Sequence, residues 1–308
     1  GNVIKSDKSL HSEGNVLLGV RDEAGNMLWT WHIWITDKPQ KQNYTRGYIA
    51  LDRNLGAIAA KPEGNPLSSR GMFGLFYQWG RPTPFQLYQE NSGNWKVRAT
   101  DSQTRVIPDV AVANPGIFYG SSSDQNDGHD WVDRTVFQNI NNLWGYREVE
   151  HSQPIKTIYD PCPVGYHVPY HRSWELMEEF WNKPEGFDEN KETKWEELQG
   201  KGIEFIIEGN SIWYPLQGYI NINGEYKHGH IHKDSNGNYH HEDIPIVENW
   251  SSLVNRHDTD DANLPAGVDE RINDSPYRLQ FTRDYLAKLS EDGEYTNRTR
   301  GLAVRCVS

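Results

Sequence analysis

The sequence predicts an α+β fold with short antiparallel strands, few helices and long loops. Short apolar runs alternate with clusters of Gly, Pro, Asn and Asp, a pattern typical of strands joined by turns. One helix start stands out at Ser173, and the segment 88–151 has no clear apolar period. We therefore expect a polar tail or linker at 1–14, followed by a single domain over 15–308 with a long insertion at about 88–151.

Composition restricts the kind of core and the kind of partner. The 308 residues include 12 Trp, 16 Tyr and 9 Phe but only 36% hydrophobic residues, so aromatic side chains must supply much of the buried surface. The formal net charge of −12, without a basic run, argues against nucleic-acid and anionic-membrane partners. No apolar stretch is long enough for a transmembrane helix, and no leader opens the chain, so we expect any signal segment to be absent already.

The N-terminal strands are predicted from alternating residues around a turn. Segments 15–20 and 27–35 flank the turn-forming residues 22–26, so we expect a β-hairpin. The second strand has bulky residues at successive positions, which indicates burial on both faces. The alternative is that its aromatic rings form an exposed sugar site.

The middle of the chain offers aromatic anchors. We expect a strand at 48–51, and a helix or turn at 71–79 whose aromatic residues pack into the core. The insertion 88–151 is expected to be anchored by large aromatic residues, namely Trp95, Phe118, Trp131, Phe137 and Trp144.

Oxygen-rich segments raise the question of calcium. Residues 124–130 carry oxygen ligands at alternating positions, as calcium loops do, but they lack the glycine position and closing Glu of an EF-hand. A plain turn rich in Asn and Asp is the preferred interpretation, so we expect no cofactor, with calcium as the alternative.

The segment 160–177 contains three prolines, a cysteine and the helix start. Pro161, Pro163 and Pro169 favour extended backbone before them, and Ser173 is the expected N-cap of a helix over 173–181. The chain has two cysteines, Cys162 and Cys306. A bridge between them would close a loop of about 145 residues and stabilise the fold by at most about 5 kcal/mol. Two separate buried thiols are the alternative.

The C-terminal third is predicted to be strands, loops and two tight turns. Segments 203–207 and 213–220 are expected strands, and the pairs Asn223-Gly224 and Asn236-Gly237 are typical hairpin turns. Centring the second turn on Asn236-Gly237 pairs His232 with His241. His230, His232 and His241 would then share a face with His228 and are candidate ligands for zinc, copper or nickel. A polar hairpin without metal is the preferred interpretation.

Several motifs occur in an order that resembles a known family. They are Cys162-Pro163-Val164-Gly165-Tyr166-His167-Val168-Pro169 before a Trp-led helix, Gly301-Leu302-Ala303-Val304-Arg305-Cys306-Val307, the pair 52–56 and 71–80, and Asn249-Trp250-Ser251-Ser252. Together they resemble the Fibrobacter succinogenes major paralogous domain family over about residues 25–308.

That resemblance implies a C-type-lectin-like fold and an extracellular or cell-surface location, on outer-membrane lipoproteins or pili. It implies a cell-surface adhesin or pilus-tip ligand-binding module that recognises an extracellular glycan, a surface protein or other pilus subunits. It also implies that strands 27–35 and 302–307 share one sheet. In an oxidising compartment, Cys162 and Cys306 are expected to be bridged.

Enzymatic alternatives have little support in the motifs. The chain lacks a Ser-His-Asp order, a glycine-rich phosphate loop, a Gly-x-Ser-x-Gly elbow and a His-Glu-x-x-His helix, so we expect no catalytic residues. Residues 165–169 and Trp174-Glu175 also resemble formylglycine-generating enzymes, whose chemistry needs a further cysteine pair. Such an oxidase, or a structural cap of a filament, is the alternative function.

The region 249–300 is the expected ligand-binding face, because loops on a rigid sheet and residues of the types Tyr, Trp and Arg often dominate recognition. The candidates are Trp250, Arg256, His257, Tyr277, Arg278, Tyr295 and Arg298. Trp250 and Tyr277 could instead be core residues. Arg256, Tyr295 and Arg298 are harder to bury and are the stronger candidates.

Overall fold

The computed structural model describes residues 13–44, 48–61, 71–120, 130–145, 155–174, 193–194, 202–207, 210–233, 239–255, 275–282, 288–289 and 298–308. In this part of the chain, short strands dominate, and the helical elements are α1 (Pro108–Ala113), the 3-10 turns η3 (Ile140–Asn142) and η4 (His171–Trp174), and 3-10 residues at 71–72. The expected α+β, lectin-like mixture is therefore wrong, because the described part is β-rich. The rest of the helix expected at 173–181 lies outside the described residues.

Local sequence explains why α1 is short. Pro108 begins the helix, where a missing N–H costs nothing, and Asn114 precedes Pro115, which disfavours a helical conformation at Asn114. Elsewhere, apolar runs of a few residues end at Gly, Pro or Asn before a helical period can develop.

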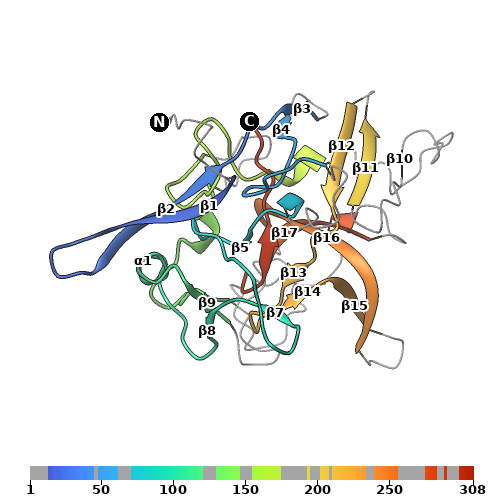
Figure 1. Cartoon of the computed structure of the whole chain (residues 1–308). Helices are drawn as coiled ribbons and strands as arrows, with labels where there is room; N and C mark the ends of the chain where they lie inside the picture. The colour runs from blue at the N-terminus through green and yellow to red at the C-terminus, as the bar shows by residue number, and fades with distance from the viewer. Residues whose placement is uncertain are drawn as a thin grey trace, which may run out of the picture.

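The main sheet has eight strands and contains the C-terminal strand near its centre (Figure 1). Its path is β14-β13-β19-β16-β17-β18, while β15 pairs with β16 and β5 pairs with β19. The strands are β5 (Phe76–Gln78), β13 (Tyr219–Ile220), β14 (Tyr226–Lys227), β15 (Gly229–Lys233), β16 (Tyr239–Asn255), β17 (Ser275–Thr282), β18 (Lys288–Leu289) and β19 (Gly301–Ala303). The β16–β19 pair is parallel, and the other pairs of this sheet are antiparallel.

Smaller sheets surround the main one. They are β3 (Lys41–Asn43) with β4 (Ile49–Leu51), β6 (Tyr88–Gln89) with β7 (Trp95–Lys96), β8 (Ala99–Asp101) with β9 (Ile117–Tyr119), and β10 (Thr193–Lys194) with β11 (Gly202–Ile207) and β12 (Asn210–Pro215). The strands expected at 48–51, 203–207 and 213–220 are thus present, the last as β12 and β13. The turn at Asn223-Gly224 joins β13 to β14 as predicted, with Gly224 at a φ of 79°.

The N-terminal hairpin stands apart from the main sheet. Strands β1 (Gly14–Arg21) and β2 (Met27–Ile35) form their own two-stranded sheet, which projects from the body at the left of Figure 1. The hairpin prediction is confirmed. The prediction that strand 27–35 shares a sheet with the last strand is wrong, because β19 is paired with β5, β13 and β16 instead.

Aromatic side chains fill the core. The first cluster is centred on Trp79, Trp131, Trp144 and Trp250, all of them buried. Three anchors expected in the insertion, Phe118, Trp131 and Trp144, are confirmed as buried residues. Phe76, Tyr77 and Trp79 enter the core as predicted for the segment 71–79. The expected helix or turn is present only at its two ends, as 3-10 residues at 71–72 and a turn at Trp79, with strand β5 between them.

Candidate functional site

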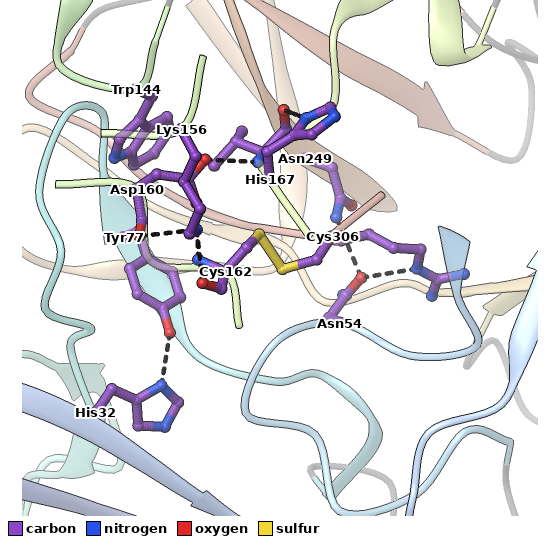
Figure 2. Close-up of a disulfide and its surroundings, with 12 residues drawn as sticks. His32, Asn54, Tyr77, Trp144, Lys156, Asp160, Cys162, His167, Asn249 and Cys306 are labelled. Carbon is purple, nitrogen blue, oxygen red and sulfur yellow. Dashed lines mark hydrogen bonds and ion pairs between the residues drawn. A yellow bond between two sulfur atoms is a disulfide. The ribbon is translucent and has the colours of Figure 1, made fainter. Parts of the chain in front are cut away.

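A disulfide ties the C-terminus to the middle of the chain (Figure 2). Cys162 and Cys306 are both buried and bonded, with their Cα atoms 5.7 Å apart and a sequence separation of 144. The predicted bridge is therefore present. Its surroundings are ordered by Asp160, which accepts hydrogen bonds from the backbone N–H groups of Cys162 and Val168 and from the Lys156 ammonium.

Residues from three of the family-like motifs meet in a buried polar network. The side-chain oxygen of Asn54 accepts hydrogen bonds from Asn249 at 3.1 Å and from Nε of Arg305 at 3.2 Å. The Arg305 guanidinium lies 3.9 Å from the ring centroid of Tyr214 and donates to the carbonyl of Trp213. Because all of these side chains are buried, the motifs act here as structural connections and not as a ligand surface.

Two of the predicted ligand residues are buried in the core, one is half-buried, and three lie outside the described residues. Trp250 is fully buried and donates from its indole nitrogen to the carbonyl of Tyr77 at 2.7 Å. Arg298 is also buried, where it contacts Asp130 and Asn141 and lies over the ring of Trp79. Tyr277 is half-buried. Arg256, His257 and Tyr295 lie outside the described residues.

Arg278, the remaining candidate, belongs to a polar cluster on the main sheet. Its Nε lies 3.3 Å from the Glu248 carboxylate, and Arg300 lies 3.5 Å from the same oxygen. Cross-strand register pairs Glu248 with Gln280 and Trp250 with Arg278, so these residues share one face of the β16–β17 ladder. We call Glu248, Arg278, Gln280, Arg300 and Tyr219 the sheet cluster.

Within the sheet cluster, Arg300 and Gln280 are partly exposed and the other members are buried. The side chains of Glu248 and Arg278 are 1% and 3% exposed, whereas that of Arg300 is 24% exposed. The Arg300 guanidinium stacks 4.6 Å from the centroid of the Tyr219 ring. The second oxygen of Glu248 accepts no hydrogen bond from the described residues. A guanidinium that lies over an aromatic ring keeps N–H donors that suit carboxylates and hydroxyl groups.

The histidine hairpin has a different register from the one predicted. Strands β15 and β16 pair His232 with His240 and Ile231 with His241, one position away from the expected pairing of His232 with His241. The loop 234–238 lies outside the described residues. In this backbone register His241 lies opposite Ile231 and not opposite His232, so the predicted cross-strand pairing of His232 with His241 is wrong.

The described residues lack the features of a metal site and of a membrane-spanning helix. They contain no group of three or more His, Cys, Asp or Glu side chains that could hold a metal ion. Of the acidic segment 124–130, only Asp130 is described, and its carboxylate is paired with Arg134 and Arg298. Within the same ranges, no helix has the length and apolar character to cross a membrane.

The projecting hairpin exposes apolar residues. Every residue from Asn15 to Arg21 of β1 is exposed, including Val16, Leu17, Leu18 and Val20, and Trp31 opposite Leu18 is 47% exposed. The expected burial of strand 27–35 on both faces is therefore wrong for Trp31 and for Leu28, which are exposed. The hairpin of β1 and β2 is therefore largely uncovered by the rest of the fold along β1 and at Leu28 and Trp31.

Polar contacts attach the base of the hairpin to the body. His32 on β2 lies between the side-chain oxygen of Asn15, 2.8 Å from its Nε2, and the hydroxyl of Tyr77, 3.0 Å from its Nδ1. Trp34 and Asn15 donate to the carbonyls of Ala57 and Gly56. Burial lowers the pKa of His32 to about 4, so the ring is neutral at pH 7.

Comparison with known proteins adds no assignment: no family model, no curated protein and no solved structure matches this chain. The family resemblance therefore depends on the motifs themselves. Their residues, including Asn54, Asn249 and Arg305, are those that the structure joins in one network.

Arg300 belongs to the predicted ligand-binding face 249–300, but sequence reasoning missed its partners Glu248 and Tyr219, which come from the separate strands β16 and β13 and show no local motif. It also missed the exposure of β1. The sequence offers no signal for that exposure, because an uncharged run with Val16, Leu17, Leu18 and Val20 is typical of a buried strand.

Proposed function

We propose that this chain is an extracellular binding module of the adhesin or pilus-tip type, which recognises a glycan or protein surface. The observation that supports this proposal best is Arg300, a partly exposed cation stacked on Tyr219 at the centre of the main sheet. Arg300 is the last residue of the region 249–300, whose composition predicts recognition. Binding at Arg300 would favour ligands with carboxylate or vicinal hydroxyl oxygens.

The disulfide supports an extracellular location and argues against the alternative function as an oxidase. A single disulfide between the only two cysteines favours an oxidising, extracellular environment. The same bridge argues against the oxidase alternative, because that chemistry needs a further cysteine pair and the sequence contains no third cysteine.

The proposal is tested with a glycan and surface-protein array, run with and without a chelator. For any ligand found, Arg300→Ala should reduce affinity at least about tenfold, since charged anchors of this kind commonly contribute more than 1 kcal/mol. Arg98→Ala, which removes an exposed arginine elsewhere, is the control and should bind normally. Equal affinity of Arg300→Ala and wild type would place the site outside the sheet cluster.

A further inference from the structure

Strand β1 is an open edge with unusual composition. Its residues Asn15–Arg21 are all exposed, so the strand is uncovered on both of its faces. Among the described strands, β1 pairs with β2 alone, which leaves its other edge without a neighbour. Natural proteins usually protect such edges with Lys, Pro, bulges or covering loops. From Gly14 to Val20 this strand has no charged residue and no proline.

We propose that the free edge of β1 pairs with β1 of a second copy of this chain, giving a four-stranded antiparallel sheet around a two-fold axis. In a symmetric register centred on Leu18, Leu18 faces its own counterpart and Val16 faces Val20 of the other copy. Leu17 would face Gly19, and Asn15 would face Arg21. Apolar residues are thus matched with apolar residues on each face, as stable cross-strand pairs require.

The chemistry of the β1 residues favours a second copy over a glycan or a nucleic acid. The chain carries a formal charge of −12, so most self-contacts would oppose like charges. The β1 edge is an exception, because the symmetric register sets Arg21 against Asn15 and brings no two charged residues opposite each other. A glycan would need polar partners that Val16, Leu18 and Val20 do not offer, and a nucleic acid would need cations.

The expected dimer is weak. One strand pair with the exposed parts of its side chains buries well below the roughly 1,600 Å² of a standard interface, so a dissociation constant in the range of about 10–500 µM is expected. Sedimentation velocity over that range should show a monomer–dimer equilibrium. A protein that remains monomeric throughout would overturn the proposal.

Two substitutions locate the contact. Leu18→Lys places two ammonium groups together at the two-fold axis and should raise the dissociation constant at least about tenfold. Val164→Lys is the matched control, because Val164 is 79% exposed and lies outside the hairpin, and it should dimerise like the wild type. Since Leu18 is 53% exposed, both variants should fold, which unchanged circular dichroism would verify. A dimer that survives Leu18→Lys would refute the β1 edge.

Cross-linking gives an independent measurement. In either antiparallel pairing, opposed Cα atoms lie about 4.5–5.5 Å apart, within the range that a disulfide spans. Leu18→Cys should therefore give a reducible covalent dimer under mild oxidation, and Val164→Cys should give at least about tenfold less. Equal yields from the two variants would indicate random collision and would contradict the proposed register.

Discussion

The hydroxyl of Tyr77 lies 3.0 Å from Nδ1 of His32, which joins the projecting hairpin to strand β5 of the main sheet. Nε2 of the same ring faces the amide oxygen of Asn15, so Nε2 carries the proton and Nδ1 accepts from Tyr77. The contact therefore requires neutral histidine. It connects the projecting hairpin of β1 and β2 with a strand of the main sheet.

Stability should fall with acid because of His32. Its pKa is about 4 in the folded protein and about 6.5 when unfolded, so the unfolded chain binds more protons between these values. The free energy of unfolding should decrease as pH falls from about 6.5 to 4. Urea unfolding at several pH values measures this. His32→Gln should flatten the pH dependence of the free energy of unfolding between about pH 4 and 6.5, whereas His167→Gln should leave that dependence intact. Identical slopes in the wild type and in His32→Gln would refute the role of His32.

The disulfide should contribute measurably to stability. Removing both cysteines as Cys162→Ala with Cys306→Ala should lower the free energy of unfolding by about 2–5 kcal/mol, because the bridge spans a separation of 144 residues. Urea denaturation of the double variant gives this number. Thiol titration of the unfolded, unreduced wild type should detect no free thiol, and a value of two thiols would exclude the bridge.

Asp130 should be essential for packing around Arg298. Its carboxylate lies 3.0 Å from the guanidinium of buried Arg298 and 3.0 Å from that of Arg134. Asp130→Asn removes the carboxylate charge that lies against the buried Arg298 guanidinium and should cost about 3–5 kcal/mol. Arg134→Ala, at a more exposed side chain, should cost less than Asp130→Asn. Thermal unfolding measures both, and equal costs would mean that Arg298 is not the partner that matters.

Asn54 should be more costly to replace than its size suggests. Asn54→Ala removes the oxygen that accepts from Asn249 and Arg305, leaving buried donors without that acceptor. A loss of about 1–3 kcal/mol is expected in chemical denaturation. Asn94→Ala, at an exposed asparagine, is the control and should change stability little. A near-neutral effect of Asn54→Ala would show that water replaces the lost oxygen.

Local patterns predicted several elements correctly. Alternation around a Gly-Asn turn identified the hairpin of β1 and β2, the Asn223-Gly224 pair identified the β13–β14 turn, and large aromatic residues identified the anchors Trp131 and Trp144. These predictions succeeded because backbone periodicity and turn conformation depend on a few neighbouring residues. The same local rules could not show that β16 and β17 would dominate a β-rich fold.

What the sequence determined by itself was therefore strand periodicity, turn chemistry and the identity of the two cysteines that could pair. Tertiary structure alone decided which strands meet and which side chains are covered. Arg298 resembled a surface ligand residue in sequence, but Asp130, 168 positions away, neutralises it inside the core. In the same way β19 pairs with β5, β13 and β16 and not with β2. Burial and strand pairing depend on charges and apolar surfaces that only the folded chain brings together, and no local pattern contains that information.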